Sequence, residues 1–124
     1  MNDKVDPRVK FEMVLSTEKF KLQRSHESTT LSVKEELDEA AAQGRPLDMT
    51  AIRYLTKRMT KTEVEIDACE YILHRLDRHR DYDLEKFTID LQHEVISGLV
   101  TSHHEQQRAL YVAAAEHLRN FKYM

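Results

Sequence analysis

The feature that most restricts the fold is a run of evenly spaced side chains between residues 52 and 76. Apolar residues recur there in alternating steps of three and four, and Thr62 is the only polar member of the series. This spacing places one stripe along a helix and is typical of helices that interlock with a neighbouring helix, as in coiled coils. The predicted seam consists of Ile52, Leu55, Met59, Thr62, Ile66, Cys69, Leu73 and Leu76.

The rest of the chain has too few turn-forming residues for most other fold classes. Its 124 residues include 2 Gly and 2 Pro, and both prolines lie where a helix would begin or end. Sheet-rich folds and Rossmann-type folds need far more turn residues than this. A chain of this length also supports a single core. The sequence therefore predicts one all-α domain over residues 1–124.

The first predicted helix spans residues 7–43. Asp6 can accept hydrogen bonds from free amides at the start, and Pro7 is tolerated at the first helical position. Gly44 and Pro46 favour termination after residue 43. The apolar pattern lapses over residues 24–31, so the sequence leaves open whether this segment is one helix or two.

Two further helices are predicted over residues 49–80 and 84–121, joined to their neighbours by short connections. Short connections make consecutive helices antiparallel neighbours. We therefore expect an elongated up-down-up bundle of three long amphipathic helices, or of four if the first is broken. The packing between them is expected to resemble that of coiled coils.

The third predicted helix also has a polar interruption, over residues 101–108. In an up-down-up bundle the first and third helices run parallel, so this interruption and the one at residues 24–31 would lie at the same height. Thr62 of the second helix falls at the same height. We interpret this level as solvated or as a kink, with a buried polar layer and a zinc or iron site as alternatives. The level would comprise His26, Glu27, Thr62, Glu63, His103 and His104, of which the candidate metal ligands are His26, Glu63, His103 and His104.

An acidic run offers a competing, enzymatic interpretation. Carboxylates one turn apart on a helix can hold Mg²⁺ against phosphate groups. The run 35–39, Glu-Glu-Leu-Asp-Glu, resembles the first metal motif of MazG-like nucleotide pyrophosphohydrolases, which are all-helical. The second motif is matched less well, because Val64 occupies a position that should be acidic. This resemblance implies Mg²⁺ and a catalytic set of Glu35, Glu36, Glu39, Glu63 and Asp67.

Charge and composition exclude some partners and locations. The net charge of −3 disfavours nucleic acid, and the apolar runs are too short for a membrane span. Arg53, Lys57 and Lys61 form a basic ridge, which we interpret as a solvated face that pairs with acidic neighbouring helices; docking of an acidic partner is the alternative. The single Cys69 indicates a reducing cytoplasm, and its place in the seam favours a small core residue over a nucleophile.

The favoured function is therefore non-enzymatic and without a cofactor. A clean seam and the lack of a convincing catalytic set predict a protein that acts through protein–protein contacts. It would be an adaptor, an inhibitor or a component of a larger, possibly viral, assembly, located in the cytoplasm or within that assembly. Binding could involve a partner protein, a second copy of the chain or both. A possible partner face near the C-terminus comprises Leu110, Tyr111, Leu118 and Phe121.

Overall fold

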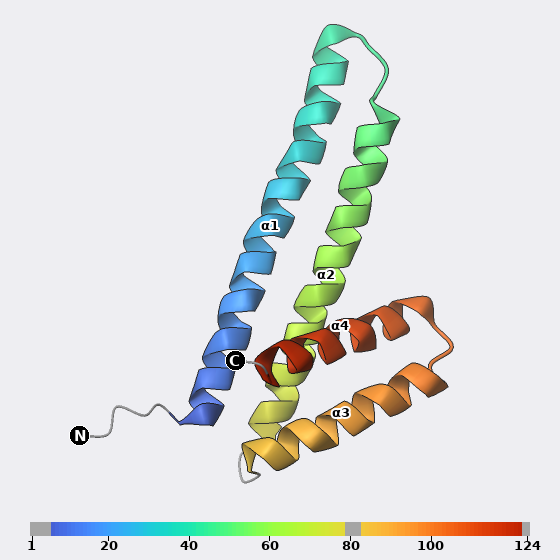
Figure 1. Cartoon of the computed structure of the whole chain (residues 1–124). Helices are drawn as coiled ribbons and strands as arrows, with labels where there is room; N and C mark the ends of the chain where they lie inside the picture. Colours follow the sequence, from blue (N-terminus) through green and yellow to red (C-terminus); the bar gives the residue numbers. More distant parts are fainter. Residues whose placement is uncertain (1–5, 79–82, 123–124) are drawn as a thin grey trace, which may run out of the picture.

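The computed structural model describes residues 6–78 and 83–122, with side chains as far as Arg119. Four helices account for nearly all of this part of the chain, which confirms the predicted all-α fold. They are α1 (Pro7–Gln43), α2 (Met49–Arg78), α3 (Leu84–Thr101) and α4 (Glu105–Lys122). Helices α1 and α2 form a long antiparallel hairpin, and the α3–α4 hairpin lies across one end of it (Figure 1).

Helix α1 has the predicted bounds, and its ends form as the sequence indicates. Oδ1 of Asp6 accepts a hydrogen bond of 3.0 Å from the amide of Arg8. At the other end Gly44 has φ of 60°, a left-handed conformation that glycine adopts without steric cost, and it terminates the helix. The following turn is held by Arg45, whose guanidinium donates two hydrogen bonds to Glu36, of 2.8 and 3.0 Å.

The hydroxyl-rich segment that interrupts the apolar pattern of α1 does not break the helix. The side chains of Thr29, Thr30 and Ser32 each donate a hydrogen bond to the carbonyl oxygen four residues earlier. Their hydroxyl groups are thereby satisfied within the helix and need no turn. The open question about residues 24–31 is settled in favour of one continuous helix, which at about 1.5 Å per residue is ~55 Å long.

The prediction of a single third helix over residues 84–121 is wrong. The chain leaves the helix at Ser102, which has an extended backbone, and resumes as α4 at Glu105. The serine organises this corner: its hydroxyl oxygen lies 3.1 Å from Oε1 of Gln107, and its carbonyl accepts a 2.9 Å hydrogen bond from Arg108. The polar interruption therefore marks a sharp reversal of the chain, and the up-down-up topology does not hold beyond α2.

Close packing of the α3–α4 hairpin depends on a glycine. A Cβ added to Gly98 would lie 2.6 Å from the ring of Tyr111. The same ring makes an edge contact with Tyr71 of α2, with centroids 6.1 Å apart. Nearby, Arg75 of α2 is paired with Glu94 of α3. Three helices thus meet at this junction.

The core is concentrated at one end of the molecule, which we call the base: residues 7–22 and 66–78 together with α3 and α4. The remainder of the long hairpin, residues 23–65, is called the arm (Figure 1). In the arm the buried residues are Thr29, Ala40 and Thr62. The apolar core of the base comprises Phe11, Leu15, Ala68, Cys69, Ile72, Leu76, Phe87, Leu91, Val95, Ala113, Ala114 and Leu118.

The predicted seam of α2 runs through both regions and is buried to different degrees. Thr62, Cys69 and Leu76 are buried, the last two completely. The other members, Ile52, Leu55, Met59, Ile66 and Leu73, are half-buried. An ion pair between Lys19 and Glu70, 3.2 Å apart, joins α1 to α2. The predicted extension of the second helix over residues 79–80 lies outside the described residues.

Candidate protein-binding site

The predicted polar level exists, but α1 and α2 form it without the third helix. His26 Nε2 lies 2.9 Å from Glu63 Oε1 across the two helices. At the same height Thr62 and Thr29 are buried, and each donates its hydroxyl to a backbone carbonyl of its own helix. Glu27, which was also predicted to belong to this level, is exposed. Thr29, which the sequence interpretation omitted, thus belongs to this level.

The remaining predicted members, His103 and His104, lie in the α3–α4 corner and are exposed. Because the chain reverses there, the assumption that α1 and a long third helix run parallel past this level fails. Within residues 6–78 and 83–119, no three His, Cys, Asp or Glu side chains are arranged to hold a metal ion. The four candidate metal ligands are therefore not gathered into one site.

The carboxylates that resemble a MazG-like metal site are also separated. Glu36 contacts Arg45 and the amide of Asp48 at the tip of the arm, whereas Glu63 pairs with His26. Ten residues of α1 separate Glu36 from His26, a distance of about 15 Å along the axis. Asp67 lies one turn beyond Glu63, toward the base, while Glu35 and Glu39 are at the tip with Glu36. The structure thus divides the implied catalytic set between two places.

Cys69 is a core residue, as the seam predicted. Its side chain is fully buried, and Sγ lies 3.4 Å from Nε2 of His117 on α4. Burial raises the pKa of the thiol to about 11, so the reactive thiolate is disfavoured at neutral pH. The contact with His117 joins α2 to α4 within the core.

The predicted partner face on α4 is used inside the molecule. Leu118 is 1% exposed and belongs to the core, and Leu110 and Tyr111 pack against the same cluster. The side chain of Phe121 lies outside the described residues. Leu110, Tyr111 and Leu118 thus attach α4 to the base.

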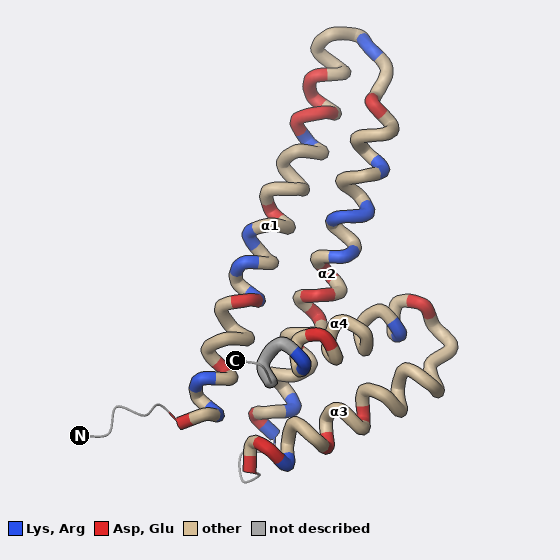
Figure 2. Tube along the Cα trace, in the orientation of Figure 1, with Lys and Arg blue, Asp and Glu red and all other residues tan. Residues whose placement is uncertain are grey.

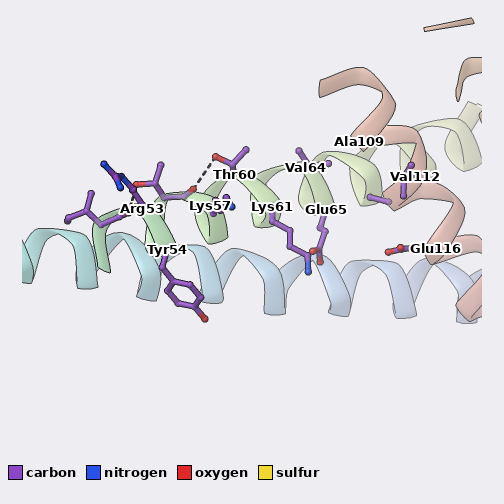
Figure 3. Close-up of a pocket in the computed structure, with 13 residues that line it drawn as sticks. Arg53, Tyr54, Lys57, Thr60, Lys61, Val64, Glu65, Ala109, Val112 and Glu116 are labelled. Carbon is purple, nitrogen blue, oxygen red and sulfur yellow. Dashed lines mark hydrogen bonds between the residues drawn. The ribbon is translucent and has the colours of Figure 1, made fainter. Parts of the chain in front are cut away.

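A groove of about 990 Å³ lies between the arm side of α2 and the exposed side of α4 (Figure 3). Val64, Val112 and Ala113 supply apolar surface where the two helices meet. Tyr54, 63% exposed, lies toward the tip of the arm. The groove is lined by Ile52, Arg53, Tyr54, Thr56, Lys57, Thr60, Lys61, Val64, Glu65, Ala109, Val112, Ala113 and Glu116.

The basic ridge recognised in the sequence forms one wall of this groove. Arg53, Lys57 and Lys61 are all exposed, and in the part of the chain that the structure describes none of them makes an ion pair. The expectation that the ridge pairs with acidic neighbouring helices is therefore wrong. Glu65 and Glu116 lie at the base end of the groove, so its charge changes sign along its length (Figure 3).

The sequence indicated the basic ridge but not the wall of the groove that α4 forms. Ala109, Val112 and Glu116 approach α2 only because the chain reverses at Ser102, and the predicted straight third helix gave them no such position. The sequence signal for this wall was the helical spacing of its residues, which places them on one face of a helix: Ala109, Val112, Ala113 and Glu116.

Comparison with family models, with curated proteins and with solved structures finds no match to this chain. The resemblance of the acidic run to MazG-like enzymes therefore has no support from a family match. None of the described helices has both the length and the apolar character needed to cross a membrane.

Proposed function

We propose that this chain is a non-enzymatic binding protein whose groove between α2 and α4 receives an acidic, amphipathic helix of a partner protein. The observation that carries the proposal is the unpaired basic ridge standing beside apolar surface in one concave site. Helix-in-groove recognition requires this combination, because apolar anchors supply burial while flanking charges fix orientation and register.

The charge pattern of the groove also indicates how charge is distributed along the partner helix. Arg53 and Lys61 are eight residues apart, so the ridge extends over about 12 Å, or two turns of a helix. Acidic side chains of the partner would face this ridge near the arm. The end of the partner helix that approaches Glu65 and Glu116 would be neutral or basic, because carboxylates there would be repelled.

Site-specific photo-crosslinking in the native host tests this proposal. A photoreactive residue at Thr60, inside the groove, should crosslink one protein species, and the same residue at the exposed His93 of α3 should not. The double variant Lys57→Glu/Lys61→Glu should lose that crosslink. Lys21→Glu, which changes an exposed lysine of α1 outside the groove, is the matched control and should keep it.

Three outcomes would contradict the proposal: equal crosslinking from residues 60 and 93, no crosslinked protein at all, or an adduct that survives the double charge reversal. Nucleic acid is the competing ligand for a basic ridge. A labelled 20-base-pair duplex that bound at low salt, and was released by Lys57→Glu/Lys61→Glu, would replace the protein partner by a nucleic acid.

A further inference from the structure

Helix α1 has a second apolar face, directly opposite the one that packs on the rest of the molecule. The buried side of the helix includes Phe11 and Leu15. On the opposite side, Met13, Phe20 and Leu31 are 61%, 58% and 58% exposed. A helix with a single apolar face is satisfied by one neighbour, whereas α1 has large side chains left over on a side that no described residue covers.

These exposed residues belong to a regular series along the outer side of α1. From residue 13 to residue 38 the series advances in alternating steps of four and three, which is the spacing of a helix–helix contact. All of its members are exposed. We call this series the outer stripe: Met13, Thr17, Phe20, Arg24, Glu27, Leu31, Lys34 and Asp38.

The outer stripe is symmetric about a point between Ser25 and His26, which is also the middle of α1. Reversing the helix about that point brings position 20 onto position 31 and position 24 onto position 27. Phe20 would then meet Leu31 of a second chain, apolar against apolar. Arg24 would meet Glu27 of the second chain, positive against negative, and each contact would occur twice.

The charges of the whole helix follow the same symmetry. The half before Ser25 is mostly basic, with Arg8, Lys10, Lys19, Lys21 and Arg24 against Glu12 and Glu18. The half after it is mostly acidic, with Glu27, Glu35, Glu36, Asp38 and Glu39 against Lys34. Figure 2 shows the acidic residues gathered toward the tip of the arm. A parallel pairing would set like charges together, whereas an antiparallel pairing sets opposite charges together.

The central charges are available for such a pairing. Within the described residues neither Arg24 nor Glu27 makes an ion pair. The guanidinium of Arg24 lies over the ring of Phe20, 5.9 Å from its centroid, so it covers part of the exposed apolar surface. From this geometry we infer that two copies of the chain associate through the outer stripes of their α1 helices, antiparallel and in the register that pairs Phe20 with Leu31.

Sedimentation equilibrium of the purified chain and a charge-swap series test this inference. The wild type should form a dimer, and Phe20→Glu should be monomeric. Arg24→Glu and Glu27→Arg should each weaken the dimer roughly tenfold, because each creates two like-charge contacts. The combined variant Arg24→Glu/Glu27→Arg should restore the wild-type dissociation constant. Circular dichroism of each variant checks that the helices remain formed.

The direction of pairing is tested by oxidation of cysteine variants in a Cys69→Ala background. Chains carrying Arg24→Cys, mixed with chains carrying Glu27→Cys, should form mixed disulfide dimers in preference to either homodimer. A wild-type monomer at high concentration, or a combined charge swap that fails to restore dimerisation, would overturn the inference. Predominant homodimers of Arg24→Cys would overturn the antiparallel arrangement.

This interface is separate from the α2–α4 groove, so the two proposals can fail independently. Lys57→Glu/Lys61→Glu should leave the dissociation constant of the dimer unchanged. Phe20→Glu should leave the crosslink from residue 60 to a partner protein unchanged. A dimer that was abolished by the groove variant would show that the second copy occupies the groove, and this would overturn the assignment to the outer stripe.

Discussion

The base and the arm are made from the same two long helices but are stabilised differently. In the base, α1 and α2 are covered by α3 and α4, and residues such as Ile72, Leu76 and Val95 are completely buried. In the arm, α1 and α2 pack mainly on one another, and the buried residues are two threonines and an alanine. Two packed helices bury only a narrow strip of surface between them, whereas four helices enclose a core.

The base and the arm also differ in what they contribute to stability and to binding. The base supplies the buried apolar area that favours folding. The arm supplies side chains that remain exposed on both of its helices, including Leu31 and Tyr54. We therefore expect substitutions in the buried core of the base to change stability more than association, and substitutions at exposed positions of α1 and α2 to do the reverse.

The largest expected effect comes from emptying the core of the base. Leu76 is 0% exposed, and Leu76→Ala should lower the free energy of unfolding by about 3 kcal/mol through lost burial and a residual cavity. Ile52→Ala, in the half-buried arm portion of the same seam, should cost about 1 kcal/mol. Urea unfolding followed by circular dichroism measures both. Equal losses would show that the arm and the base do not differ.

A second substitution tests how the α3–α4 hairpin is attached to the base. In Gly98→Ala the new methyl group would meet the Tyr111 ring at 2.6 Å, so the ring must move from its contact with Tyr71. Overpacking of this kind costs about 1–3 kcal/mol. Thermal unfolding measures the loss, and Ser97→Ala, at an exposed neighbouring position, is the control. If Gly98→Ala had unchanged stability, α3 and α4 would have to pack less closely at this position than the contact with Tyr111 implies.

Alkaline pH should destabilise the base through Cys69. Burial raises the pKa of this thiol from 9.0 to about 11, so the folded protein disfavours the thiolate relative to the unfolded chain. Stability is therefore complete below pH 9 and should fall as pH rises toward 11. Cys69→Ala should flatten this dependence in urea unfolding between about pH 8 and pH 11. An identical dependence in the variant would contradict the assignment to Cys69.

The smallest effect is expected at the tip of the arm, in acid. The side-chain hydrogen bond from Arg45 holds the pKa of Glu36 below its ordinary value of 4.5. The contribution of this pair is therefore present above pH 4.5 and is lost as pH falls through the lowered pKa. Glu36→Gln should remove this part of the acid dependence, with little change at neutral pH because the pair is near the surface. NMR titration of the Gly44 amide, beside the pair, would report it.

The sequence predicted much of the fold because its information lay in periodicity and helix ends. Asp6, Pro7 and Gly44 act locally, so the bounds of α1 could be stated without knowing the tertiary structure. The seam of α2 likewise depends on spacing within one helix. The break in the third helix was missed because a polar run such as 101–108 can be a solvated turn of helix or a corner. What distinguishes them is the contact of Gly98 with Tyr111, which is tertiary.

The candidate site was less predictable for the same reason. His26 and Glu63 could be placed at one height by counting residues along two antiparallel helices. The groove could not be placed by counting residues, because its second wall depends on the position of α4 after the reversal at Ser102. The spacing of the basic ridge indicated where charge would be, whereas only the packing shows that Lys57 lines one groove with Val112 and makes no ion pair with a described residue.

The outer stripe lies on α1 and the groove lies between α2 and α4, and this placement determines the form of an assembled pair. Two chains joined through α1 would carry one α2–α4 groove each, related by a two-fold axis and on the far side of the arm from the junction. Such a pair is bivalent. It could hold two identical partner helices at a fixed separation, and a target that presents two such helices would be bound with the gain in avidity that follows from effective concentration.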